Sequence, residues 1–185
     1  MKNPIVCFIL ASMFFAAAPA ARAENLWTES FPNVKNWTIV SDPGEGSTIT
    51  SSGGLAVLYV DKGKTQAAFA PLQTEATTVA FDPSKASEYT ISWKIDHLTT
   101  SVSWDLAMDE FDANKKYINT VWNIFPIKGN CVSIGEFSKN LGGYVWKPET
   151  RYIAPKIDVY TGDPKQTVYV TYIKIDRVKK AGLKL

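Results

Sequence analysis

Acidic side chains are the first residues in this sequence that could do chemistry. Asp105, Asp109 and Glu110 stand close together, Asp112 follows them, and Glu136 stands further along. A glycosidase needs two carboxyl groups at a fixed separation, one acting as acid and the other as nucleophile or base. Alternation along a strand would place Asp105 and Asp109 on one face, whereas Glu110 and Asp112 fall in an expected turn. The acids therefore lack the tight alternation on one strand that a glycosidase motif has.

Other catalytic chemistries find less support. A lyase would use a Tyr or His base with Arg and Asn, but the only histidine, His97, and the pair Arg151-Tyr152 stand beside expected turns. Cys131 is the only cysteine after residue 23, and we interpret it as a small buried residue because no base is expected beside it. The sequence contains no serine-hydrolase, phosphate-loop or zinc-ligand pattern. We therefore predict that the protein is not an enzyme.

Aromatic side chains favour binding instead, because flat rings stack on the apolar faces of sugars. Trp146 and Tyr144 lie in the segment 140–148, where two glycines and a proline predict an irregular loop. We predict that these two rings form an exposed ligand platform, with the alternative that Trp146 covers the core. Three further tryptophans fall on the apolar faces of expected strands, and we predict that they belong to the core: Trp93, Trp104 and Trp122.

Polar side chains on the expected strands could supply the hydrogen bonds of a sugar site. Asn and Asp can pair with neighbouring hydroxyl groups. We predict that polar residues of several strands line one concave sheet surface: Lys94, Asp96, Asp105, Tyr117, Asn119 and Asn123. The alternative is an ordinary solvated sheet face, which antiparallel sandwiches normally have.

The elements that would position these residues are short strands. In residues 89–96 the apolar Tyr89, Ile91, Trp93 and Ile95 alternate with polar residues, and helical periodicity is almost absent from the chain. Similar patterns between turn residues predict strands at 38–40, 47–51, 55–61, 66–72, 101–109, 116–125, 144–146, 152–160 and 167–178. In 116–125, Trp122 shares the expected face of Ile118 and Ile124. The spacing predicts an all-β fold, an antiparallel β-sandwich or jelly roll.

The first 23 residues predict a secretory signal peptide. Lys2 precedes an apolar run at 5–18, and Ala21-Arg22-Ala23 is a small-x-small cleavage site. Cleavage would leave 24–185 as a single β-sandwich domain, secreted or periplasmic and without a membrane span. Removing Lys2 and Arg22 leaves 18 basic against 18 acidic side chains. A neutral chain has no electrostatic footprint for nucleic acid and favours an uncharged partner.

Several short motifs follow one another along the chain: Glu29-Ser-Phe31, Trp37-Thr38, Gly44-Glu-Gly46, Gly53-Gly-Leu55, FDPSKASEYTISW at 81–93, and Tyr172-Ile-Lys-Ile-Asp176. In this arrangement the sequence resembles the galactose-binding-like jelly-roll superfamily, especially the carbohydrate-binding modules attached to secreted glycoside hydrolases. The resemblance implies a jelly roll with Trp37 in its core. It also implies that the strand ending near Asp176 closes the fold beside the first strand.

Many modules of that family hold a structural calcium between the first and last strands. The resemblance implies that Glu29 and Asp176 are its side-chain ligands, with backbone carbonyls of 46–51 supplying others of the six to eight oxygens. The family often has a second acid where this sequence has Arg177, whose positive charge competes with a cation. The alternative is that Glu29 and Asp176 are ordinary strand-end acids.

These observations lead to one preferred hypothesis, an exported, non-catalytic carbohydrate-binding module that recognises a neutral glycan or polysaccharide. One alternative is a secreted structural or adhesive jelly-roll protein that binds a protein partner and no sugar. The other is a small glycan-active hydrolase or lyase.

Overall fold

The computed structural model describes residues 23–72, 77–125 and 132–179. The predicted signal peptide, apart from Ala23, and Cys131 lie outside these residues. Among the described segments, no helix has the length and hydropathy that crossing a membrane requires.

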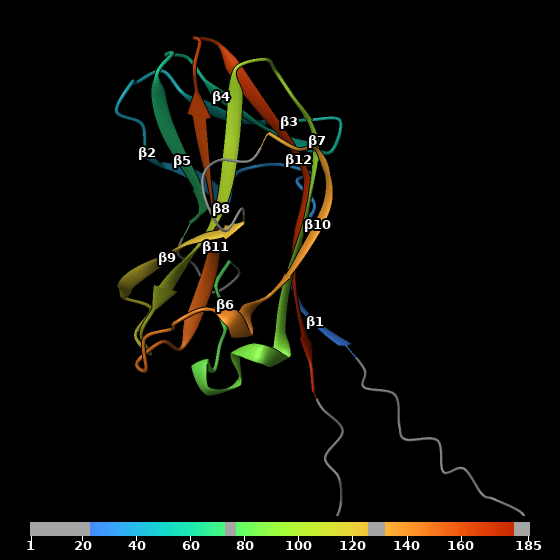
Figure 1. Cartoon of the computed structure of the whole chain (residues 1–185), viewed down its shortest axis with the longest axis vertical. Coiled ribbons are helices and arrows are strands. Elements are labelled where there is room, and N and C mark those ends of the chain that lie inside the picture. Colours follow the sequence, from blue (N-terminus) through green and yellow to red (C-terminus); the bar gives the residue numbers. More distant parts are fainter. Residues whose placement is uncertain (1–22, 73–76, 126–131, 180–185) are drawn as a thin grey trace, which may run out of the picture.

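Two antiparallel sheets face each other across the core (Figure 1). The first sheet has the order β10 (Gly135–Asn140), β7 (Tyr89–Leu98), β12 (Gln166–Val178), β4 (Leu55–Val60) and β3 (Thr48–Ser52), and β1 (Ala23–Glu29) also pairs with β12. The second sheet has the order β2 (Trp37–Ser41), β5 (Thr65–Pro71), β11 (Tyr152–Thr161), β8 (Val102–Phe111) and β9 (Tyr117–Phe125), and β6 (Val79–Ala80) pairs with β11. Two short 3-10 helices, η1 (Pro83–Glu88) and η2 (Leu141–Gly143), complete the described elements. The fold is an all-β antiparallel sandwich of the jelly-roll type, as the strand pattern predicts.

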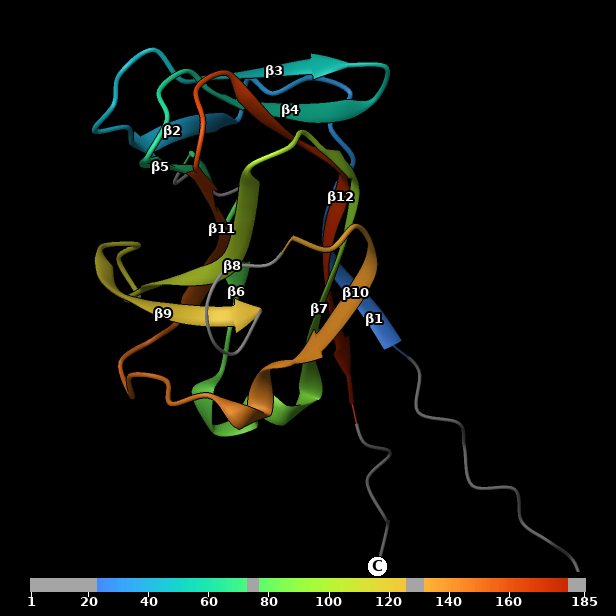
Figure 2. The same ribbon diagram turned by 45° about the horizontal axis from the view of Figure 1, so that its top comes forward.

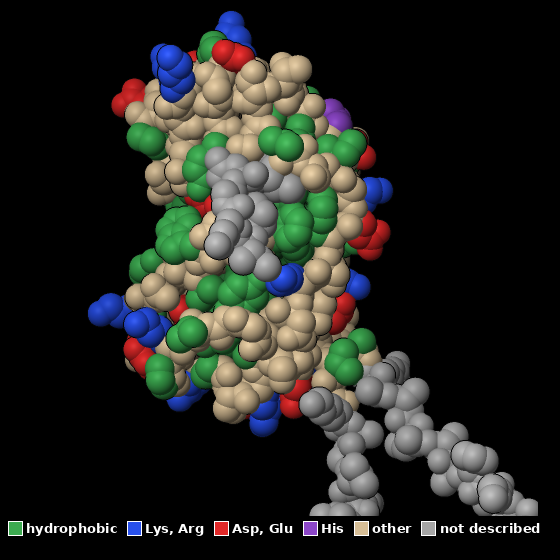
Figure 3. All heavy atoms as spheres, in the orientation of Figure 1, with side chains coloured by type: hydrophobic (Ala, Val, Ile, Leu, Met, Phe, Trp, Pro, Cys, Tyr) green, Lys and Arg blue, Asp and Glu red, His purple; other side chains and the backbone are tan. Residues whose placement is uncertain are grey.

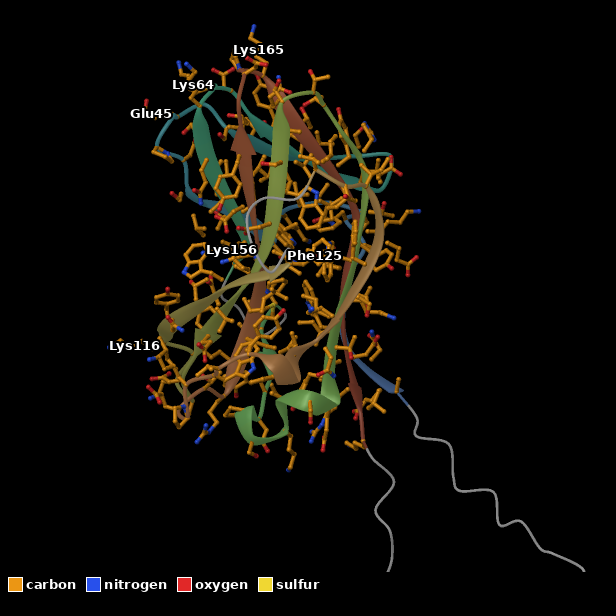
Figure 4. All side chains as sticks on the ribbon, viewed as in Figure 1. Glu45, Lys64, Lys116, Phe125, Lys156 and Lys165 are labelled. Carbon is orange, nitrogen blue, oxygen red and sulfur yellow. The ribbon has the colours of Figure 1, made fainter. Side chains whose placement is uncertain are left out.

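Alternation along the strands builds the core. In β7 the side chains of Tyr89, Ile91, Trp93 and Ile95 are buried, while the intervening residues are partly exposed. On β8, which lies in the opposite sheet, Trp104 is also fully buried. Four rings meet between the sheets, with centroids 4.9 to 6.1 Å apart: Trp93, Trp104, Phe125 and Phe137. Figure 4 labels Phe125 in this inner layer. Trp37 is buried as well, so three of the tryptophans predicted for the core lie there.

The last strand closes the fold against the first. β12 pairs antiparallel with β1, with Asn25 opposite Asp176 and Glu29 opposite Ile173. β12 also pairs with β7 and β4, so it occupies the interior of the first sheet. Figure 2 shows β1 alongside β12, and β3 and β4 crossing the end of the sandwich that comes forward. The predicted closing strand is confirmed.

One predicted strand is wrong. Residues 144–146 form no strand and follow η2, whereas the strand at this edge is β10, which pairs with β7. β10 has the sequence GEFSKN, in which Phe137 packs against the core cluster. Because this segment has a single large apolar residue, its alternation is too weak to predict a strand. The other predicted strands are present close to their expected positions.

Candidate functional site

A groove crosses the outer face of the second sheet, on the side away from the first sheet. It has a volume of about 330 Å³ and is lined from β2, β5, β8, β9 and β11. We call it the outer groove and define it by six of its lining residues: Gln66, Asp109, Tyr117, Trp122, Lys156 and Asp158. Figure 3 shows the left-hand outline of the molecule hollowed at mid-height, and Figure 4 places Lys156 on this outer side.

The strand pattern explains why polar residues face the groove. On β11, Ile157 and Val159 point into the core, so Lys156 and Asp158 point outward between them. On β8, the buried Leu106 and Met108 alternate with outward-facing residues in the same way. Asp158, Lys156 and the outward-facing acids of β8 are nevertheless almost wholly buried, because the floor of the groove lies below its rim.

Trp122 forms one wall of the groove, and the prediction that it belongs to the core is wrong. Its side chain is 49% exposed. Along β9, Val121 lies opposite Met108 and Phe125 lies opposite Leu106, so β9 uses two more residues than β8 over this stretch. Asn123 takes up the extra length in a left-handed conformation, with φ 56°. Trp122 therefore turns outward, although Ile124, two residues along, is fully buried.

Lys156 joins the wall of the groove to its floor. Its Nζ lies 3.8 Å from the centroid of the Trp122 ring and 3.7 Å from Asp109 Oδ1. The Thr120 hydroxyl donates to the same Asp109 oxygen at 2.6 Å, and Thr120 Oγ1 lies 2.9 Å from the Tyr117 hydroxyl. This chain of contacts connects the Lys156 ammonium and the side chains of Trp122 and Tyr117 through one polar network.

Two further acids lie at the floor, where Asp158 lines the groove and Asp105 lies beneath it. Asp105 on β8 and Asp158 on β11 lie directly opposite each other, with 3% and 0% of their surface exposed. Gln66 Nε2 donates to Asp158 Oδ1 at 3.0 Å, and the Tyr160 hydroxyl donates to Asp105 Oδ2 at 3.1 Å. Among the described residues, Asp105 Oδ1 and Asp158 Oδ2 have no donor. Burial, and after it the negative charge of Asp158, raises the pKa of Asp105 to about 6. Burial also raises the pKa of Asp158 and that of the Tyr160 hydroxyl.

Asp105 and Tyr117 are the predicted binding residues that belong to this region. Tyr117 is 50% exposed on the groove wall, whereas Asp105 lies beneath the floor. Asn123 lies at the bulge that turns Trp122 outward. Asn119 is partly buried, and its amide donates to Glu110 Oε1 at 2.8 Å. The predicted surface is thus brought together in part.

Trp146 and Tyr144 lie elsewhere. Trp146 is 8% exposed, its ring centroid is 4.6 Å from that of Phe81, and its Nε1 donates to the Leu141 carbonyl at 2.9 Å. The prediction of an exposed Trp146 platform is therefore wrong, and the alternative of a ring covering the core is confirmed. Tyr144 is partly buried, and its hydroxyl donates to the Ile124 carbonyl at 2.7 Å. Loop composition misled the prediction because a loop can fold back onto the core.

Lys94 and Asp96 do not share a surface with the other predicted residues. Both lie on β7, in the first sheet, whereas Asp105 and Tyr117 lie in the second. The alternation along β7 and β8 was interpreted correctly, but it does not tell which sheet a strand joins.

Glu29 and Asp176 do not fit a shared calcium site. Asn25, not Glu29, lies opposite Asp176. The Glu29 carboxylate accepts from the Phe31 amide at 2.9 Å and from Trp37 Nε1 at 3.4 Å. Asp176 accepts from Asn25 Nδ2 at 2.9 Å and pairs with Lys174 Nζ at 2.9 Å. Within the described segments, no three side chains of His, Cys, Asp or Glu gather as a metal site would require.

No protein-family model matches the chain, and no curated protein matches it. Solved structures do resemble it. One is the low-affinity xylan-binding module CBM86 from Roseburia intestinalis, with 12% identity over 82% of this chain and 96% of that one, and a TM-score of 0.44. Another is the CBM22-1 xylan-binding domain of Paenibacillus barcinonensis Xyn10C, with 13% identity over 89% and 100% of the two chains and a TM-score of 0.44.

A third similar structure is the enzymatically active domain of tailspike protein 4 from bacteriophage CBA120. It shares 15% identity over 77% of this chain, with a TM-score of 0.47, and the chain spans only a fifth of its length. Since all three TM-scores lie below 0.5, the fold assignment rests on the strand order and register described above.

The sequence patterns did not predict four residues of the outer groove: Trp122, Lys156, Asp158 and Gln66. A signal existed for two of them, because alternation in residues 152–160 places Lys156 and Asp158 on the face opposite Ile157 and Val159. For Trp122 and Gln66 the sequence holds no comparable signal.

Proposed function

We propose that the chain is an exported, non-catalytic carbohydrate-binding module that recognises a neutral glycan through the outer groove. The observation that carries this proposal is the half-exposed Trp122 ring standing beside a row of hydrogen-bonding groups in one groove. Export is supported by the predicted signal peptide, and amino-terminal sequencing of the exported protein should begin at Glu24.

The groove combines the two chemistries that sugar recognition in water needs. Lys156 approaches one face of Trp122, and nearly half of the tryptophan side chain stays exposed for stacking against a sugar ring. Tyr117 offers a second exposed aromatic surface. Gln66 and Lys156 bring donor groups to the floor between them, where they can meet sugar hydroxyls.

The charges of the groove favour an uncharged ligand. Asp109 and Asp158 line it together with one cation, Lys156, and that cation already lies beside Asp109. A uronate would therefore meet net negative charge at short range, where Coulomb repulsion is strong in a partly buried site. A neutral sugar experiences no such repulsion.

The arrangement supports binding better than glycoside cleavage. A glycosidase places its two carboxyl groups on either side of the scissile bond, with the substrate between them. Asp105 and Asp158 instead lie side by side on neighbouring strands, and both are buried.

Affinity electrophoresis tests the proposal. The mature chain, residues 24–185, would run in native gels containing soluble xylan, hydroxyethylcellulose, galactomannan or polygalacturonate, beside a non-binding reference protein. Xylan is the first probe because two of the similar structures are xylan-binding modules. We expect retardation by at least one neutral polysaccharide and none by polygalacturonate. Normal migration in every neutral gel, or retardation by polygalacturonate alone, contradicts the proposal.

A further inference from the structure

The acid pair in the groove floor has a feature that sugar binding alone does not explain. Each carboxyl group has one oxygen satisfied by a donor, Asp158 by Gln66 and Asp105 by Tyr160. The remaining oxygens, Asp105 Oδ1 and Asp158 Oδ2, are buried and have no donor among the described residues. Asp105 and Asp158 are direct partners in the register of β8 and β11, so their buried carboxyl groups are neighbours on one face of the sheet.

Two ionised carboxylates cannot hydrogen-bond to each other, because both are acceptors only. One proton held between the two groups would give each unpaired oxygen a hydrogen bond. It also removes one of two negative charges held together in a buried site, and like charges at such separations repel strongly. Pairs of carboxyl groups that share a site in this way retain one proton well above the pH at which a single carboxyl group loses it.

The surrounding charges determine what happens when the proton leaves. On β11, Lys156 interacts favourably with both carboxylates and Tyr160 donates to one of them. On β8, Asp109 adds negative charge, and β5 presents the uncharged Gln66. β9 presents Trp122, Thr120 and the Tyr117 hydroxyl, and β2 contributes only Val40 and Ser41 to the lining. Lys156 is thus the one cation among the described lining residues.

We propose that Asp105 and Asp158 hold one shared proton, and that the outer groove binds its glycan only while this proton is present. Loss of the proton leaves two adjacent carboxylates that draw the Lys156 ammonium towards them. Lys156 then leaves Trp122 and Asp109, and the groove loses the contacts that hold its wall in place against its floor. Gln66 and Tyr160 are displaced with the separating carboxyl groups. This proposal concerns the regulation of the same groove and rests on the proposed function for its binding readout.

The first experiment needs no ligand. Carboxyl ¹³C chemical shifts of the aspartates would be followed from pH 3 to pH 9 in the wild-type protein and in Asp105→Asn. The amide of the variant can donate permanently to Asp158, so it replaces the shared proton. We expect one wild-type transition near pH 6, sensed by both residues, that is absent from Asp105→Asn. If neither carboxyl group titrates above pH 5, the proposal is overturned whether or not the protein binds sugar.

The second experiment measures affinity against pH. Retardation in soluble xylan, or in the neutral polysaccharide of the panel that binds best, would be measured at pH 5, 6, 7 and 8. If only the protonated form binds, its fraction sets the apparent affinity, and binding weakens by about 100-fold between pH 5 and pH 8. Asp105→Asn should bind with the same affinity at all four values, and Asp163→Asn, an exposed acid, should behave as the wild type.

The outcomes separate the two proposals. Wild-type binding that changes less than threefold from pH 5 to pH 8 overturns the dependence of binding on the shared proton and leaves the proposed function intact. An equal change in Asp105→Asn overturns it as well. Absence of binding at every pH contradicts the proposed function, and the titration then decides the shared proton by itself. Asp158→Asn, with circular dichroism to verify folding, replaces Asp105→Asn if that variant does not fold.

Discussion

The ammonium of Lys156 on β11 lies 3.8 Å from the centre of the Trp122 ring on β9, although β8 separates these two strands. The lysine reaches across β8 at Ala107, its partner in the strand register, whose methyl group leaves room for the long side chain. The contact is therefore made across the sheet by a buried lysine and a half-exposed tryptophan. It connects the wall of the outer groove to the acids of its floor.

Trp122→Ala should weaken glycan binding by about tenfold or more, because the substitution removes the main stacking face, and tenfold corresponds to about 1.4 kcal/mol. The thermal midpoint should change little, since half of the side chain is already exposed. Affinity electrophoresis at pH 5 measures the loss. The matched control is Tyr169→Ala, which removes a partly buried ring that stacks on His97 in the first sheet. Equal losses in both variants would contradict a site in the outer groove.

Trp146→Ala should act on stability instead. The ring is buried against Phe81 and its Nε1 is hydrogen-bonded, so truncation leaves a cavity and an unpaired carbonyl. Such substitutions cost about 3–5 kcal/mol. Urea unfolding measures the free energy, with Val145→Ala as the neighbouring control, because Val145 is 92% exposed and should change stability by less than about 0.5 kcal/mol. A loss below about 1 kcal/mol in Trp146→Ala would show that the ring is not part of the core.

Asn123 should tolerate glycine and reject valine. Its φ of 56° lies in the left-handed region, which Asn and Gly adopt readily and a β-branched residue does not. Asn123→Val should lower the free energy of unfolding by about 1–3 kcal/mol and weaken glycan binding, because the bulge orients Trp122. Asn123→Gly should retain binding close to the wild-type value. Equal affinity of the valine variant would mean that the bulge does not determine the orientation of Trp122.

Asp105 should make stability fall as pH rises. The folded state raises its pKa from the ordinary 3.8 to about 6, so the folded protein binds the proton more tightly than the unfolded chain does. The stabilisation is complete below about pH 4 and is lost as pH rises through about 6. As pH rises from 4 to 7, the free energy of unfolding of Asp105→Asn should therefore increase relative to that of the wild type, by on the order of 2 kcal/mol. Urea unfolding at both pH values gives this difference, and a difference that stays constant would contradict the raised pKa.

Chelation should leave stability unchanged. Glu29 and Asp176 each have donors on both carboxylate oxygens and lie opposite different residues, so they do not converge on a cation. The thermal midpoint should be the same in EDTA and in excess calcium. A midpoint several degrees lower in EDTA would show that calcium stabilises the fold at ligands other than this pair.

The sequence predicts most of the fold because alternation is a local property. Tyr89, Ile91, Trp93 and Ile95 alternate within one segment, and no information from other strands is needed to place them on one apolar face. β10 escapes prediction for the same reason, since its single large apolar residue creates no pattern. The motifs that suggested a jelly roll also indicated correctly that β12 closes against β1.

By itself, then, the sequence determined the all-β class, the buried faces of the strong strands, the core position of Trp93 and Trp104, and the closing strand. Only the tertiary structure decided which polar residues meet. Lys156, Trp122 and Asp109 come from three strands, and Asp105 meets Asp158 only because β8 and β11 pair in one register. A bulge at Asn123 then reversed the face of Trp122. The physical reason is that alternation fixes the side of a strand on which a residue lies, whereas strand order, register and bulges depend on contacts between segments far apart in the chain.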